Sequence, residues 1–77
     1  MSEVLSFAAV RAAVAHELYL RPDELDPEAD LFAAGLDSVR VLTLVERWRA
    51  AGAQVGFMDL IERATVREWW ELLHVDR

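Results

Sequence analysis

Apolar residues recur every three or four positions along most of this chain, and this spacing limits the possible folds more than any other feature. Phe7, Val10, Val14 and Leu18 form the first such stripe, which predicts an amphipathic helix over residues 4–20 capped by Ser2 or Ser6. No segment alternates apolar and polar residues as a half-buried strand does. The pattern therefore predicts an all-α fold.

The length of the chain limits how many cores it can build. A chain of 77 residues buries about 60–65% of the surface that it exposes when unfolded, which is enough for one compact core. The absence of cysteine excludes a disulfide framework, a thiolate nucleophile and a thiolate metal site. We therefore expect residues 1–77 to form a single domain.

A loop is predicted after the first helix, because residues 21–30 hold two prolines and five acids. Leu25, Leu31 and Phe32 are the apolar residues in and just after this segment. We expect them to hold the loop across the open side of the helices.

A second helix is predicted to start at Ser38, because Asp37 is a good N-cap for its first turn. It is expected to end near Gly52, since glycine readily takes the left-handed conformation that terminates helices. Its predicted inward stripe consists of Val41, Leu42, Val45 and Trp48.

Two further helical segments complete the predicted architecture. A short third helix is expected from Phe57, and the last helix opens with a capping box from Thr65 to Glu68. Trp69 and Trp70 follow, and because neighbouring residues on a helix point in different directions, one of them must be only partly covered. The sequence thus predicts a small four-helix bundle with three main helices and one short third helix.

Charge and hydropathy restrict the classes of partner. Fourteen acids against eight arginines give a net charge of −6, which argues against nucleic-acid binding, although Arg40, Arg47 and Arg49 keep a helix-turn-helix alternative open. No apolar run reaches the roughly 20 residues of a membrane helix, and the N-terminus lacks an export signal. We expect a cytoplasmic monomer.

Residues 35–40 read Gly-Leu-Asp-Ser-Val-Arg. This segment resembles the phosphopantetheine attachment site of acyl and peptidyl carrier proteins, and with Glu46-Arg47-Trp48-Arg49 it is more similar to the aryl carrier proteins of siderophore and related nonribosomal peptide assembly lines. The residues 57–60, 65–66 and 69–73 agree with that family, so the resemblance covers essentially the whole chain. The chain departs from this family in two ways. Many aryl carriers are the C-terminal domain of a longer protein with an isochorismate-cleaving enzyme in front, which these 77 residues do not include. In addition, Ala64 stands where the family often has proline.

The resemblance implies a covalent cofactor. A phosphopantetheinyl transferase using coenzyme A and Mg²⁺ would join 4′-phosphopantetheine to Ser38 through a phosphodiester, with Asp37 helping to place the serine and the metal. Gly35 would permit a tight turn and leave room for the transferase, and Leu36 completes the motif. The N-terminus of a helix suits an anionic phosphate. Because the thiol belongs to the arm, a chain without cysteine can still hold a thioester.

The resemblance also implies partner enzymes. An adenylating enzyme would load an aryl acid such as a hydroxybenzoate, and a condensing or tailoring enzyme would unload it. The family docks its partners beside the serine, which here gives six candidates: Val39, Arg40, Thr43, Arg47, Phe57 and Ile61. For Phe57 and Ile61, the alternative to partner docking is a position in the hydrophobic core. An aminoacyl or polyketide-type cargo is the rival within this class, and an unmodified helical adaptor is the rival from another class.

We predict a carrier that is not itself an enzyme, because no nucleophile–base pair, phosphate-binding glycine loop or catalytic carboxylate pair is visible. Asp26, Glu28 and Asp30 alternate as at the start of an EF-hand loop. Leu31 takes the place of the required glycine, however, and Asp37 takes that of the final glutamate. No metal site is therefore predicted, and His16 and His74 are expected at the surface.

Overall fold

The computed structural model describes residues 6–74 and contains four α-helices and one 3₁₀ helix in that range. Their order is α1 (Phe7–Glu17), η1 (Pro22–Glu24), α2 (Ser38–Ala50), α3 (Phe57–Ile61) and α4 (Val66–His74). No strand occurs among these described residues. The predicted all-α four-helix bundle is confirmed.

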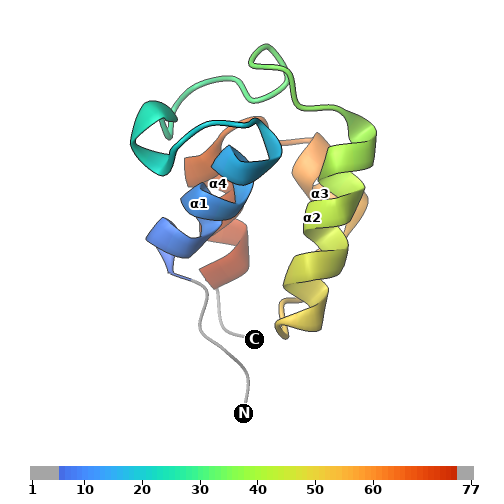
Figure 1. Cartoon of the computed structure of the whole chain (residues 1–77). Helices are drawn as coiled ribbons and strands as arrows, with labels where there is room; N and C mark the ends of the chain where they lie inside the picture. The colour runs from blue at the N-terminus through green and yellow to red at the C-terminus, as the bar shows by residue number, and fades with distance from the viewer. Residues whose placement is uncertain (1–5, 75–77) are drawn as a thin grey trace.

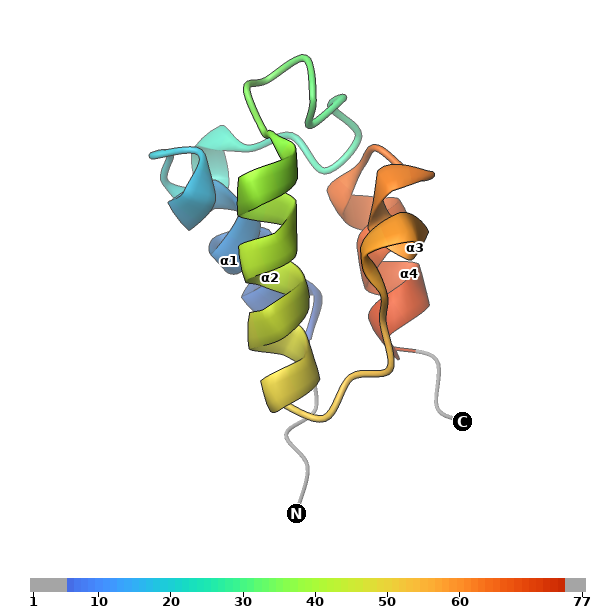
Figure 2. The same cartoon turned by 90° about the vertical axis from the view of Figure 1, so that its right-hand side faces the viewer.

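The helices are arranged around the long segment that joins η1 to α2. In Figure 1 this segment passes over one end of the bundle, where α1 ends and α2 begins. Figure 2 shows α3 beside α2 and in front of α4. The start of α1 and the end of α4 lie at the opposite end of the bundle from the start of α2.

Helix α1 is shorter than the helix predicted over residues 4–20, because it is capped at both ends inside that range. The Ser6 hydroxyl accepts a hydrogen bond from the Ala9 N–H at 3.0 Å, which makes Ser6 the N-cap; Ser2 lies outside the described residues. At the other end, Tyr19 adopts a φ of 60° and turns the chain away after Glu17.

The other helix ends follow the predicted caps. Asp37 caps α2 through a 2.9 Å bond to the Arg40 N–H, and Gly52 ends that helix with a φ of 101°. Thr65 accepts from the Glu68 N–H at 3.2 Å, while the Glu68 carboxylate accepts from the Ala64 N–H at 3.4 Å. The capping box is thus confirmed, with its return bond one residue earlier than expected.

One apolar core joins all four helices and the long segment. Trp48 of α2 and Trp69 of α4 meet edge to face, with ring centroids 6.1 Å apart. Trp69 is fully buried and Trp70 only partly, as predicted. Within residues 6–74, fifteen apolar side chains are buried: Val10, Ala13, Val14, Ala15, Leu25, Leu31, Leu36, Val41, Leu44, Val45, Trp48, Val55, Leu60, Val66 and Trp69.

The prediction that Leu42 faces the core is wrong. Its side chain is 48% exposed, whereas Leu44 is completely buried. The inward positions of α2 are 41, 44, 45 and 48, which follow the i, i+3, i+4, i+7 rule. Leu42 follows Val41 by about 100° around the helix and so falls outside this stripe.

The predicted anchoring of the long segment is confirmed. Leu25 and Leu31 are buried in the core, and Phe32 packs against it. The Leu31 N–H donates to the Ala64 carbonyl at 2.8 Å, and the Arg11 Nε–H donates to the Leu25 carbonyl at 2.8 Å. Side-chain burial and backbone hydrogen bonds therefore fix the segment that leads to Ser38.

Candidate functional site

Ser38 is the first residue of α2 and is exposed. It stands at the end of the bundle where the long segment enters the helix (Figure 1). The N-terminus of a helix offers backbone N–H groups and the positive end of the helix dipole. An exposed hydroxyl at this position fits a phosphodiester, whose negative charge the helix end favours.

The residues before Ser38 set the direction from which the chain enters the helix. Leu36 is 4% exposed, and its N–H donates to the carbonyl of the buried Leu31 at 3.0 Å. Gly35 has a φ of 115°, a conformation that residues with a side chain rarely adopt. A Cβ at this glycine would meet no atom within 4 Å, so the requirement is for the backbone conformation and the surrounding space is open.

Asp37 uses both carboxylate oxygens within the first turn of α2. One oxygen accepts from the Arg40 N–H at 2.9 Å, and the other lies 3.3 Å from the Arg40 guanidinium. The Asp37 side chain remains 56% exposed. The motif therefore places a fixed and accessible carboxylate immediately before the serine.

Arg40 turns back toward the end of α1. Its Nε–H donates to the Glu17 carbonyl at 2.9 Å, and its guanidinium also donates to the Tyr19 hydroxyl at 3.0 Å. The pKa of Arg40 lies above its usual range, chiefly because of the hydrogen bond with Tyr19 and also because of the charges of Asp37 and Glu17. A raised pKa favours the charged form of the guanidinium.

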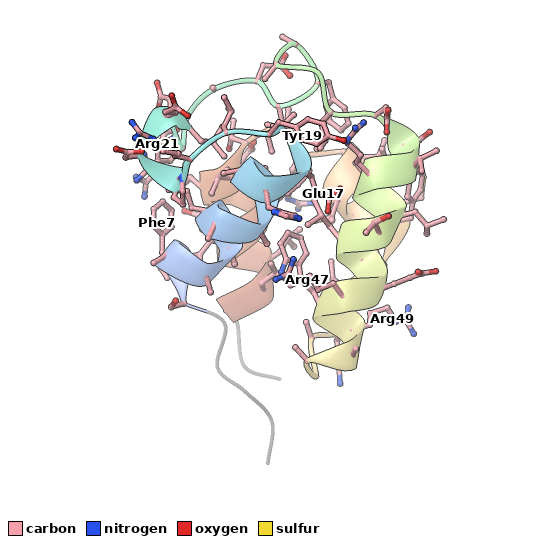
Figure 3. All side chains as sticks on the ribbon, in the orientation of Figure 1. Phe7, Glu17, Tyr19, Arg21, Arg47 and Arg49 are labelled. Carbon is pink, nitrogen blue, oxygen red and sulfur yellow. The ribbon has the colours of Figure 1, made fainter. Side chains whose placement is uncertain are left out.

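The outer face of α2 continues from Ser38 with exposed side chains. Val39 is 73% exposed, and the Thr43 hydroxyl donates to the Val39 carbonyl at 3.1 Å. Arg47 is also exposed and lies further along α2 (Figure 3). Leu42, which the sequence had placed in the core, is also exposed on this helix.

Helix α3 extends this outer face beside α2. Phe57 and Ile61 are partly buried and pack against the core, so each combines a core contact with some exposed surface. Met58 is 59% exposed and was not foreseen, because a helix of five residues is too short for a sequence period to define its faces.

The acids of the long segment make hydrogen bonds within the segment and an ion pair with α4. Asp26 accepts from the Glu28 N–H at 2.9 Å, Asp30 accepts from the Phe32 N–H at 3.0 Å, and Glu28 pairs with Arg67. The described part of the chain holds no group of three or more His, Cys, Asp or Glu residues arranged to bind a metal. His16 is exposed, as predicted, whereas the His74 side chain lies outside the described part.

None of the described helices is both long enough and apolar enough to cross a membrane. The candidate site consists of the start of α2, the long segment before it and the outer face of α2 and α3 beside it.

The sequence of the chain is similar to those of known proteins. Residues 8–73 match the family described as phosphopantetheine attachment site. The chain is 47% identical over 73 residues to acyl carrier protein ScoB of Streptomyces coeruleorubidus, covering 95% of this chain and 86% of that protein.

Two longer proteins are also similar to the chain. The chain is 47% identical over 64 residues to an isochorismatase of Bacillus subtilis, covering 83% of this chain but 20% of that protein. It is 44% identical over 64 residues to a phenyloxazoline synthase MbtB of Mycobacterium tuberculosis, of which it spans only 4%. No solved structure matches the chain significantly. The chain belongs to the phosphopantetheine attachment family, whose members bear covalently attached 4′-phosphopantetheine, and it is a carrier protein, not an enzyme.

Proposed function

We propose that Ser38 bears the 4′-phosphopantetheine arm. The observation that carries this proposal is an exposed serine hydroxyl at the first position of α2, directly after the Asp37 cap and the left-handed Gly35. The helix end favours the phosphate, and the open space around Gly35 admits a transferase.

The cargo that we propose is an aryl acid held as a thioester on this arm. Two kinds of support are the Gly-Leu-Asp-Ser-Val-Arg segment, which resembles aryl carriers, and the similarity to proteins named isochorismatase and phenyloxazoline synthase. An adenylating enzyme loads the acid and a condensing or tailoring enzyme removes it, while the carrier supplies position and effective concentration. The similarity to most of acyl carrier protein ScoB supports residues 1–77 working as one carrier domain.

We assign partner docking to the outer face of α2 and α3. Val39 and Leu42, one and four residues after Ser38, and Met58 of the adjacent α3 expose large apolar side chains, which often mark an interaction site. Thr43 lies one turn after Val39 on α2, Phe57 and Ile61 belong to α3, and Arg47 lies further along α2 on the side toward α1 (Figure 3). Arg40 stays a candidate for partner contact through the part of its side chain, 31%, that is exposed.

The test of the attachment site is the intact mass of the protein after incubation with coenzyme A, Mg²⁺ and a phosphopantetheinyl transferase. We expect one phosphopantetheine on the wild type and on Ser2→Ala, which serves as the matched serine control, and none on Ser38→Ala. Modification of Ser38→Ala would show that another residue bears the arm. A wild type that is folded and stays unmodified with its cognate transferase would favour the unmodified adaptor.

The cargo is tested separately on the modified protein. A panel of adenylating enzymes supplied with aryl acids and amino acids is scored by which thioester appears on the arm. Predominant loading with a hydroxybenzoate is expected. Predominant loading with an amino acid would overturn the aryl assignment while leaving the carrier role intact.

A further inference from the structure

Tyr19 holds an unusual position in the backbone at the end of α1. Its N–H donates to the His16 carbonyl at 3.2 Å, and the next N–H, of Leu20, donates to the Ala15 carbonyl at 2.9 Å. This pair of bonds is the Schellman motif, whose left-handed residue is usually glycine. Tyr19 takes the left-handed conformation with a φ of 60°, which is energetically unfavourable for an aromatic residue.

The end of α2 provides an internal comparison. There the Gly52 N–H donates to the Arg49 carbonyl at 3.0 Å, and the Ala53 N–H donates to the Trp48 carbonyl at 2.9 Å. Gly52 has a φ of 101°, so the same kind of motif is formed without a side chain. The backbone turn alone therefore does not explain a tyrosine at position 19, and a strained residue of this kind points to a role for its side chain.

Core packing does not explain the tyrosine either, because Tyr19 is 85% exposed. Its side chain extends from the end of α1 toward the start of α2 (Figure 3). There its hydroxyl accepts from the Arg40 guanidinium at 3.0 Å, and the guanidinium carbon lies 5.2 Å from the ring centroid. The ring is thus fixed by one partner, Arg40, two residues after Ser38.

Arg40 contacts two groups at the end of α1 and one at the start of α2. In addition to Tyr19, it binds the Glu17 carbonyl at 2.9 Å and lies 3.3 Å from the Asp37 carboxylate. The planar guanidinium has donors that diverge in fixed directions, whereas a lysine ammonium is a single compact donor centre. Arg40 therefore joins the last turn of α1 to the cap of α2.

We propose that Tyr19 and Arg40 are positioning residues for the modification of Ser38: together they hold the Asp37 carboxylate and the first turn of α2 against the end of α1. The transferase then meets the Ser38 hydroxyl in one orientation. This inference rests on the proposed attachment at Ser38. It predicts that loss of the Tyr19–Arg40 contact slows the transfer itself and does not merely weaken docking.

The test measures kcat and KM of a phosphopantetheinyl transferase acting on the wild type and on Tyr19→Asn, Arg40→Lys, Arg40→Gln and Arg21→Lys variants of the full chain. Tyr19→Asn removes the ring but suits the left-handed backbone, so it is expected to melt no lower than the wild type. Arg40→Lys keeps the positive charge but replaces the planar guanidinium and its diverging donors by a compact ammonium group. Arg21→Lys is the matched control, because Arg21 pairs only with the exposed Asp23 and Glu24 among the described residues.

We expect kcat to fall about five- to tenfold in Tyr19→Asn and Arg40→Lys, with KM nearly constant, and to stay at the wild-type value in Arg21→Lys. Since the chain has one tyrosine, ¹³C-labelled tyrosine gives one set of ring signals, which should shift in Arg40→Lys and not in Arg21→Lys.

Three results would overturn the inference. A rise in KM alone would make Tyr19 and Arg40 docking contacts. Unchanged kinetics in both variants would leave them without influence on the transfer. A wild-type kcat in Arg40→Lys together with a reduced kcat in Arg40→Gln would show that a positive charge at position 40 suffices for the transfer. If the wild type itself were never modified, the proposed function would fail instead of this inference. Ser38→Ala, measured beside the wild type, shows whether the modification that is followed occurs at Ser38.

Discussion

The indole N–H of Trp69 donates to the Leu60 carbonyl in the last turn of α3 at 3.0 Å, and to the Arg63 carbonyl, two residues past that helix, at 2.7 Å. A helix end leaves such carbonyls without intrahelical partners, so a buried side chain of α4 satisfies the end of α3. A helix of five residues is not stable by itself. The position of α3, and with it part of the outer face beside Ser38, therefore depends on Trp69.

Replacement of Trp69 by phenylalanine removes both hydrogen bonds and part of a buried ring. We expect a loss of about 2–4 kcal/mol in the free energy of unfolding, measured by urea denaturation. Amide hydrogen exchange should increase most at α3. A loss below about 0.5 kcal/mol would mean that the hydrogen bonds to Leu60 and Arg63 contribute little.

Leu42 and Leu44 form a matched pair on one helix, since they have the same side chain and opposite burial. Leu44→Ala should cost about 2–4 kcal/mol of stability, whereas Leu42→Ala should cost less than about 1 kcal/mol. The docking assignment further predicts that Leu42→Ala raises the KM of a condensing or tailoring enzyme for the loaded carrier. An unchanged KM for every partner enzyme would remove Leu42 from the docking surface.

The two glycines at positions 35 and 56 differ in backbone conformation. Gly35→Ala must adopt a φ near 115°, so we expect a loss of about 1–2 kcal/mol and slower modification of Ser38. Gly56 has an ordinary φ of −116°, and a Cβ there would lie 3.4 Å from the Asp59 carboxylate, so Gly56→Ala should cost less. Thermal melts and the rate of mass gain check both statements. Equal losses in the two variants would contradict the conformational argument.

Asp37 combines a helix cap with an ion pair, and substitutions separate the two. An asparagine side chain also caps helices well, so Asp37→Asn should lose only the pair with Arg40, about 0–1 kcal/mol for side chains that are 31% and 56% exposed. Asp37→Ala should lose about 1–2 kcal/mol, because the Arg40 N–H then loses its acceptor. Chemical denaturation compares the two variants. If asparagine destabilised the protein as much as alanine, the ion pair would outweigh the cap.

Much of the site was predictable because it depends on local chemistry. The Asp37 cap, the Ser38 helix start and the Thr65 capping box each involve residues within four positions of one another, and such patterns are visible in the sequence. It was harder to predict which face of α2 points to the core, because five of the seven residues from 39 to 45 are apolar and more than one apolar stripe is possible. Only packing against the other helices selects Leu44 over Leu42.

The contact between Tyr19 and Arg40 lay beyond sequence reasoning for a different reason. A left-handed residue at a helix end is expected to be glycine, so a tyrosine gives no signal for that conformation. The Arg40 bond to the Glu17 carbonyl spans 23 positions, and nothing local announces it. Such contacts depend on how the ends of two helices meet, which the folded chain alone determines.

The start of α1 and the end of α4 lie at the end of the bundle remote from Ser38 (Figure 1). A neighbouring domain, affinity tag or surface linker attached beyond either helix would extend away from the serine and leave its approach clear. The same bundle can therefore be fused, immobilised or embedded in a larger polypeptide without obstructing the hydroxyl. That arrangement is compatible with similar sequences occupying only a small fraction of much longer proteins.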